Sequence, residues 1–294
     1  MRVSVILSTY NAPDWLEKAI WGYACQSYQD FELLIADDGS TEETAARTEC
    51  LRRETGLAIR HLWQEHRGFR KCTILNKAIA ASSTDYLVFS DGDCIPRWDF
   101  LATHVSLAEK RCFLSGGAVR LPMALSRLIS KEDILARRVT DAKWLLASGL
   151  GKNPRLRMLT WRAWLARFWD AVTTTQATWN GCNVSAWKVD VVRANGYDER
   201  MEYGGLDREL GERLVNAGLR GKQVRHRAIC IHLDHPRAYV RQEALAYNRA
   251  VRKDTRQNRI AWTPYGIEQP LKLAEVGEAF EQGGQESEPR RAAA

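Results

Sequence analysis

The sequence predicts an α/β fold in which helices flank a mostly parallel, Rossmann-like sheet. Three short apolar runs, at residues 3–7, 31–36 and 86–89, are typical of buried strands, and apolar residues recur at helical spacing over about 12–25. Strands that alternate with helices form right-handed βαβ units, so these strands would run in the same direction. Their carboxyl ends would then meet at one edge of the sheet, where open α/β sheets bind ligands.

Polar residues follow each predicted strand. The first run is followed by Ser8, Thr9, Tyr10 and Asn11, the second by Asp37 and Asp38, and the third by Asp91, Gly92 and Asp93. Two carboxylates at the last spacing suit Mg²⁺ or Mn²⁺, which take their remaining ligands from water and substrate phosphates. A diphosphate is therefore the expected ligand. The alternative is an ordinary solvated turn, in which Asp and Gly are also common.

Four motifs together resemble the family 2 glycosyltransferases of the GT-A fold. They lie at 4–11, 26–33, 37–41 and 91–93, in the order and at the spacings of that family. The resemblance implies a GT-A fold and the transfer of a sugar from a nucleotide donor, a UDP-sugar in particular.

The resemblance also implies a role for each polar strand end. Tyr10 would stack on the uracil, because a tyrosine ring offers a flat face to a base. Asp38 would bind the base or the ribose, since a carboxylate accepts hydrogen bonds from an imide N–H or a hydroxyl group. Asp91 would lie near the ribose and the metal ion, and Asp93 would hold Mn²⁺ or Mg²⁺. The same donor-binding set includes Ser8, Thr9, Asn11 and Gly92.

A basic segment at 66–78 lies between the second and third of these strand ends. Arg70 and Lys71 would open a helix here, and both helix N-termini and cationic side chains attract anions, so either residue could contact the uracil carbonyl or the diphosphate. The resemblance matches Asn76 as a further donor-binding residue and favours Arg70 over Lys71. The alternative is a solvated basic turn.

Two segments of the second half, 179–187 and 203–214, resemble the galactosyltransferase-like C-terminal half of GT-A enzymes. There a Gly-rich loop carries Glu-Asp at the start of a helix, and the Asp acts as general base toward the acceptor hydroxyl. Here Leu206 replaces the Glu, and Asp207 holds the Asp position. The alternative for Asp207 is a carboxylate that stabilises the helix N-terminus. The residues expected to contact the acceptor are Trp179, Asn180 and Gly205.

His232 is the candidate third metal ligand, because it directly follows an apolar run and imidazole can complete an Mn²⁺ site. His235 is the second choice, and a histidine without a ligand is the alternative. The 7 cysteines are an odd number without paired metal spacing, which indicates free thiols rather than a zinc site or a disulfide framework.

Five parts are predicted along the chain. They are a nucleotide-sugar-binding half at 1–120, a helical segment at 121–178, an acceptor and catalytic half at 179–240, a helical extension at 241–274 and a disordered tail at 275–294. The sequence contains no apolar run of membrane-spanning length and starts directly with a predicted core strand rather than a signal peptide. We therefore expect a cytoplasmic protein.

The net charge of +7 requires an explanation. Basic residues between 127 and 167 alternate with tryptophans, a pattern that suits an anionic membrane surface and suits nucleic acid about as well. The resemblance favours peripheral contact with the inner face of a membrane, and no nucleic-acid partner. Alternatively, these tryptophans pack on the catalytic core.

The favoured function is an inverting, metal-dependent glycosyltransferase that acts on a glycan or lipid-linked acceptor in surface polysaccharide or lipopolysaccharide synthesis. A sugar nucleotidyltransferase would share the sheet and the metal carboxylates, but it typically begins with a Gly-rich phosphate loop, which this sequence lacks. A non-catalytic nucleic-acid-binding protein would explain the pI of about 9.1 but not the acidic strand ends.

Overall fold

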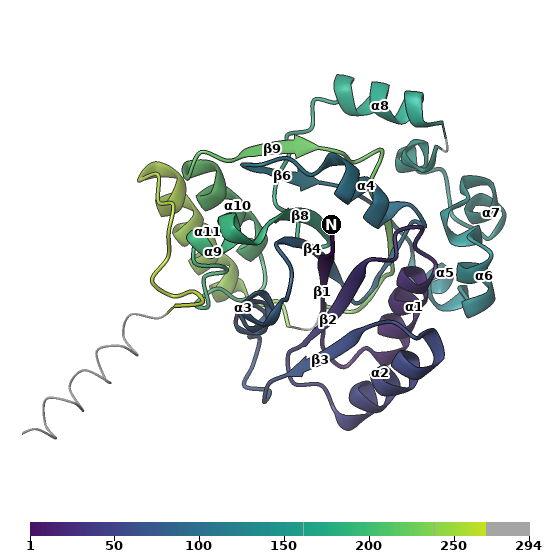
Figure 1. The fold of residues 1–294 in the computed structure, drawn as a ribbon, viewed down its shortest axis with the longest axis horizontal. Coiled ribbons are helices and arrows are strands. Elements are labelled where there is room, and N and C mark those ends of the chain that lie inside the picture. The colour runs from purple at the N-terminus through teal and green to yellow at the C-terminus, as the bar shows by residue number, and fades with distance from the viewer. Residues whose placement is uncertain (161, 238, 269–294) are drawn as a thin grey trace, which may run out of the picture.

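The computed structural model describes residues 1–160, 162–237 and 239–268. A seven-stranded sheet forms its centre, with strand order β3-β2-β1-β4-β8-β6-β9 (Figure 1). Its strands are β1 (Val3–Thr9), β2 (Phe31–Asp37), β3 (Ile59–Trp63), β4 (Tyr86–Asp91), β6 (Cys112–Ser115), β8 (Asn183–Trp187) and β9 (Arg220–Gln223). The first four in chain order are parallel, while β8 is antiparallel to both β4 and β6. The predicted α/β class is confirmed.

Helices cover both faces of this sheet. They are α1 (Pro13–Ala24), α2 (Glu42–Thr55), α3 (Lys71–Ala81), α4 (Phe100–Leu107), α9 (Lys188–Arg193) and α10 (Leu206–Asn216), and α11 (Gln242–Gln257) packs against α10. Strand β1 is buried on both sides: Val5 belongs to the core with Ile20 of α1, and Ile6 to the core with Ile74 of α3. Such burial is the reason that strands of a parallel sheet are continuously apolar. Figure 1 shows α1 and α2 on one side of the sheet and α3 and α10 on the other.

A second, three-stranded sheet has the order β5-β10-β7. Its strands are β5 (Cys94–Pro96), β7 (Gly117–Arg120) and β10 (Ile229–His232). In the antiparallel pairing of β5 with β10, His232 lies opposite Cys94. This pairing brings a residue from late in the chain beside the carboxylates that follow β4.

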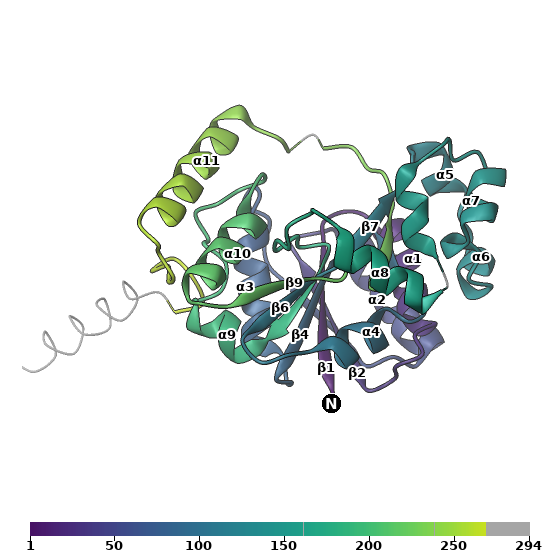
Figure 2. The same cartoon turned by 90° about the horizontal axis from the view of Figure 1, so that it is seen from above.

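The segment predicted to be helical, at 121–178, contains a series of short helices. They are α5 (Met123–Leu128), α6 (Lys131–Leu135), the 3₁₀ helices η1 (Arg138–Thr140) and η2 (Pro154–Leu159), α7 (Ala142–Ala147) and α8 (Ala163–Val172). Figure 2 shows α5, α6 and α7 together on the α1 side, at the end of the molecule opposite α11.

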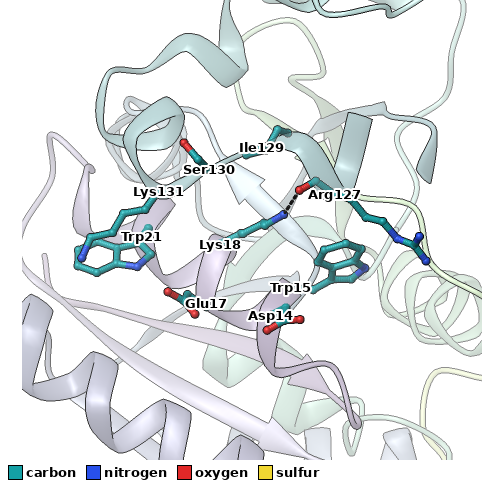
Figure 3. Close-up of a pocket in the computed structure, with 9 residues that line it drawn as sticks. All are labelled: Asp14, Trp15, Glu17, Lys18, Trp21, Arg127, Ile129, Ser130 and Lys131. Carbon is teal, nitrogen blue, oxygen red and sulfur yellow. Dashed lines mark hydrogen bonds between the residues drawn. The ribbon is translucent and has the colours of Figure 1, made fainter. Parts of the chain in front are cut away.

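The first part of this segment is fastened to α1. The Lys18 amine donates to the carbonyl oxygens of Ser126 and Arg127, at 2.8 and 3.2 Å, and Lys131 lies over the ring of Trp21. A pocket of about 460 Å³ remains between α1 and the α5–α6 connection (Figure 3). No residue of the predicted site lines this pocket.

No helix in the described ranges is long and apolar enough to cross a membrane. The predicted tail at 275–294 and the tryptophan at position 161 lie outside the described residues.

Candidate functional site

The polar ends of β1, β2 and β4 meet at one edge, as the sequence predicts. Strand β1 lies between the other two in parallel register, with Ser8 opposite Asp91 and Thr9 opposite Asp37. The Ser8 hydroxyl donates to Oδ1 of Asp91 at 2.7 Å, and the Gly92 amide donates to the Ser8 carbonyl at 2.8 Å. Thr9 is buried, and its hydroxyl has no hydrogen-bond partner within the described chain.

Lys71, at the start of α3, lies among the carboxylates of this edge. Its amine donates to Oδ1 of Asp91 at 2.6 Å. Burial alone would lower the pKa of Lys71, but the carboxylates of Asp91, Asp207 and Asp93 raise it above its ordinary value. Burial likewise opposes ionisation of Asp91, and the Lys71 ammonium nevertheless lowers the pKa of that carboxyl. Lys71 and Asp91 are therefore a charged pair at neutral pH.

Arg70 differs from Lys71 in its contacts. Its backbone amide donates to Oδ2 of Asp38 at 2.7 Å, which fixes the start of α3 against the end of β2. Its guanidinium makes no hydrogen bond or ion pair with the part of the chain that the structure describes. The Arg70 guanidinium, which is expected to contact the donor, is thus available to a ligand, whereas the Lys71 amine is bonded to Asp91.

Asp38 and Tyr10 form a separate part of the edge. Asp38 is buried and also accepts a hydrogen bond from Gln64 at 2.7 Å; burial raises the pKa of its carboxyl. The Tyr10 side chain is 42% exposed, and its ring stacks on His66 with centroids 4.6 Å apart. One aromatic face is therefore already covered by His66. A planar base would stack on the opposite Tyr10 face or displace the histidine.

Asn11 shapes the loop beside Tyr10. It has a left-handed backbone with φ of 44°, its amide donates to the Ser40 hydroxyl at 2.8 Å, and its side-chain oxygen accepts from the Thr41 amide at 2.9 Å. Asn11 therefore joins the loops that follow β1 and β2.

His232 and His235 both direct a ring nitrogen at Asp93. In each ring Nδ1 donates to a backbone carbonyl, that of Leu233 at 2.8 Å and that of Pro236 at 3.0 Å, so the lone pair of the neutral imidazole lies on Nε2. Nε2 is 3.9 Å from Asp93 in His232 and 3.1 Å in His235.

Donor atoms of Asp91, Asp93 and His232 all lie within 4.8 Å of one another. Carboxylate oxygens and an imidazole nitrogen with a free lone pair suit Mn²⁺ or Mg²⁺. The residues present therefore fit the metal site that the sequence predicts.

Asp207 approaches the same edge from the opposite half of the chain. Gly205, with φ of 105°, turns the chain into α10 and leaves Asp207 in its first turn. The loop at Gly181 comes so close that a Cβ atom there would lie 2.4 Å from Oδ1 of Asp207. Burial, with a smaller contribution from Asp91, raises the pKa of Asp207 to about 6 despite the opposing Lys71 charge. A carboxylate with this pKa can accept a proton near neutral pH.

Two residues expected to contact a ligand, Trp179 and Asn76, are buried in the structure. Trp179 is completely buried, packs between Phe89 and Phe113, and donates to the Tyr197 hydroxyl at 2.9 Å, so it is a core residue and not an acceptor contact. It was expected at the site because it belongs to the 179–187 segment that carries the resemblance.

Asn76 is also a structural residue. Its amide group donates to the Tyr197 carbonyl and to Glu199, and its oxygen accepts from the Tyr197 amide, so no polar atom remains for a donor. Asn180 donates to the Gly116 carbonyl and accepts from the Asn183 amide, which closes the loop before β8. The expectation for Asn76 is corrected, because hydrogen bonds within the protein occupy its buried amide. Asn180 is partly exposed, and its contact with an acceptor stays a prediction.

Leu206 is explained by its surroundings. It is 4% exposed and lies in the apolar cluster under α10, together with Leu210 and Met201. The position therefore faces the core, where an unpaired Glu would be costly.

Sequence reasoning missed Gln64 and His66. Both follow β3, a half-exposed edge strand that was not predicted. The sequence did contain a signal for this strand end, since the run at 59–63 is followed by polar residues. A search for every polar strand end would have included them.

Comparison with known proteins agrees with this geometry. Residues 4–128 match the sequence model of "Glycosyl transferase family 2". Validoxylamine A glucosyltransferase of Streptomyces hygroscopicus subsp. jinggangensis is 29% identical over 74% of this chain and 52% of that protein. Chondroitin synthase of Escherichia coli is 24% identical over 80% of this chain and 35% of that protein. The chain thus spans about half the length, or less, of these curated relatives.

Solved structures share the fold. The mannosyltransferase PcManGT from Pyrobaculum calidifontis, in complex with GDP-Man and Mn²⁺, superimposes with a TM-score of 0.58 at 18% identity, covering 98% of this chain and 76% of that chain. S. aureus TarS in complex with UDP-GlcNAc gives a TM-score of 0.59 at 15% identity, covering 85% and 65%. The chain has the GT-A fold of these solved structures, and its residues 4–128 are similar to the family 2 glycosyltransferases.

Proposed function

We propose that this protein is an inverting, metal-dependent glycosyltransferase that moves a sugar from a UDP-sugar to a hydroxyl group of a glycan or lipid-linked acceptor. The observation that carries the proposal is that Lys71, whose amine contacts Asp91 at 2.6 Å, also interacts electrostatically with Asp93 and Asp207, and that burial raises the pKa of Asp207 to about 6. One part of the site can therefore bind a donor diphosphate while another accepts a proton.

The donor would bind along the edge formed by β1, β2 and β4. Tyr10 offers a stacking face to the uracil, and Arg70 has an uncommitted guanidinium for the diphosphate. Asp93, Asp91 and His232 would hold Mn²⁺ or Mg²⁺. When bound, such a cation neutralises charge on the departing diphosphate.

Asp207 would act on the acceptor. Its carboxylate takes the proton of the acceptor hydroxyl, the acceptor oxygen forms a bond to the anomeric carbon, and the bond from that carbon to the diphosphate oxygen breaks. One displacement inverts the anomeric carbon, so an α-linked donor gives a β-linked product. Lys71 keeps Asp91 ionised during this step through its 2.6 Å contact.

The choice of UDP rests on the sequence motifs and on the nucleotide in the TarS complex, whereas the PcManGT complex contains GDP-Man. We would incubate the protein and Mn²⁺ with UDP-GlcNAc, UDP-glucose and GDP-mannose, and measure the slow release of nucleoside diphosphate. Release from a UDP-sugar that Asp93→Ala abolishes supports the proposal. Release from GDP-mannose alone would reject the UDP assignment, and release of a nucleoside monophosphate would indicate attack at phosphorus.

A peripheral position on the inner face of a membrane fits α8. Trp164, Phe168 and Val172, spaced four residues apart, are 65, 51 and 49% exposed and form an apolar stripe. Arg155 and Arg157 lie near enough to Arg225 that their charges add to burial in lowering its pKa. An exposed apolar stripe beside clustered arginines suits an anionic lipid surface. This position would bring the site to a lipid-linked acceptor.

Trp169 does not share this exposure. It packs against Phe168 and His226 and lies under the Arg157 guanidinium. Trp164 is thus available for the membrane contact that we propose, whereas Trp169 packs against the protein.

A further inference from the structure

Three of the seven cysteines meet beside the carboxylate edge. The Sγ atoms of Cys94, Cys182 and Cys230 lie within 4.8 Å of one another, and all seven cysteines are free thiols. The sequence conceals the cluster, because its members are far apart in the chain and lack the close spacing of familiar thiol metal sites.

Strand pairing in two sheets creates the cluster. Cys94 begins β5, and Cys230 lies in β10, its antiparallel partner. Cys182 directly precedes β8, and its carbonyl oxygen accepts from the Ser90 hydroxyl of β4 at 3.0 Å and from the Cys230 thiol at 3.7 Å. The thiols are therefore held in place by the two sheets rather than by a mobile loop.

Three thiols in this arrangement suit a soft cation. Tetrahedral Zn²⁺ binds thiolates at about 2.3 Å, which places its sulfur ligands about 3.8 Å apart. Separations up to 4.8 Å need a contraction of about 1 Å at most. Cys94 and Cys230 are buried and Cys182 is partly exposed, so an ion could enter past Cys182.

The cluster is continuous with the carboxylate site. The Cys94 thiol donates to Oδ1 of Asp93 at 3.4 Å, and Sγ of Cys94 lies within 4.8 Å of donor atoms of Asp91 and His232. A cation on the three sulfurs would thus have the Asp93 carboxylate, 3.4 Å from Sγ of Cys94, available as a fourth ligand. A second divalent cation on the same carboxylate would lie close to the first, and the repulsion between the two charges favours one ion at a time.

We propose that Cys94, Cys182 and Cys230 form a binding site for a thiophilic divalent cation of the Zn²⁺ class, which recruits Asp93 and thereby excludes Mn²⁺ from the carboxylate site. The exclusion of Mn²⁺ depends on one part of the proposed function, namely that the carboxylate site binds Mn²⁺. The thiol site stands independently of nucleotide binding and catalysis.

Cadmium alone is the probe for the thiol site, because Cd²⁺–thiolate bonds give an ultraviolet charge-transfer band. The full-length reduced protein, without nucleotide, should bind one Cd²⁺ with this band. Cys182→Ser should lose most of the band, whereas Cys112→Ser, a buried cysteine outside the cluster, should keep it. Cys230→Ser is the second variant, and thermal melting shows which variants are folded.

Exclusion is measured separately by the electron paramagnetic resonance signal of free Mn²⁺. At Zn²⁺ concentrations ten times its dissociation constant, the apparent dissociation constant of Mn²⁺ should rise about tenfold in wild type and stay nearly unchanged in Cys182→Ser. Cd²⁺ binding without a thiolate band, or an equal band in folded Cys182→Ser and Cys230→Ser, would overturn the site. Simultaneous binding of Zn²⁺ and Mn²⁺ would overturn the exclusion. Neither result would affect a UDP-dependent reaction in Mn²⁺ alone.

Discussion

Replacing Asp207 by Asn distinguishes a general base from a carboxylate that only stabilises its helix. Burial raises the pKa of Asp207 from 3.8 to about 6. This shift means that ionising Asp207 costs about 3 kcal/mol more in the folded protein than in the unfolded chain. Because the residue is only partly buried, solvent screening reduces the expected effect to about 1–2 kcal/mol. Asn carries no charge, so Asp207→Asn should stabilise the folded protein at pH 7 by that amount and raise its Tm by a few degrees.

The stability that Asp207→Asn adds to the folded protein should increase as the pH rises. The folded pKa lies above the unfolded value, so protonated Asp207 stabilises the fold below about pH 4, and this stabilisation is lost as the pH rises through about 6. The Tm difference between variant and wild type should therefore be small at pH 4, grow up to pH 6 and stay constant above. Melting curves followed by circular dichroism between pH 4 and 8 measure this difference.

A first-turn carboxylate elsewhere provides the control. Glu42 is exposed in the first turn of α2, and Glu42→Gln should lower Tm slightly, because a negative charge favours a helix N-terminus. In Asp207→Asn the higher Tm should accompany a loss of transfer of about two to four orders of magnitude, with little change in UDP affinity. A variant that melts below wild type at pH 7 and retains its turnover would refute the reasoning and assign Asp207 to helix stabilisation.

Further predictions concern the donor, the pH dependence and the membrane. Asp93→Ala should abolish Mn²⁺-dependent UDP binding in calorimetry while the melting curve stays cooperative; unchanged affinity would remove Asp93 from the metal site. Tyr10→Ala should weaken UDP binding about tenfold, because base stacking on an aromatic ring contributes about 1–3 kcal/mol. In wild type, kcat/KM should rise with pH through about 6 as Asp207 loses its proton, and a flat profile from pH 5 to 8 would exclude it as the base. The double substitution of Trp164 and Phe168 by Ser should reduce salt-sensitive sedimentation with anionic liposomes, whereas Trp169→Ser should mainly lower stability.

The sequence predicted the part of the fold that rests on local pattern. Strands buried on both faces appear as continuous apolar runs, so β1, β2 and β4 were evident, and the polar residues after them marked the binding edge. Strand β3 was missed because it lies at the sheet edge with only its first residue fully buried. Gln64 and His66 were missed with it.

Contacts between distant segments could not be predicted in the same way. Trp179 and Asn76 have residue types and positions that suit a ligand site, but only the packing of α3 and α10 on the sheet shows that they are buried and already bonded. The cysteine cluster depends on the pairing of β5 with β10, which nothing in their short sequences specifies. Lys71 was placed second because the resemblance favours Arg70, and its contact with Asp91 depends on how α3 packs beside the end of β4.

A crystal soaked with UDP and Mn²⁺ tests the central claim, that this edge binds a nucleotide diphosphate through a divalent cation. We expect an anomalous manganese peak within bonding distance of Asp93 and His232, with the uracil against the ring of Tyr10. A manganese peak that contacts neither residue, or a nucleotide bound in the pocket between α1 and the α5–α6 connection, would contradict the account.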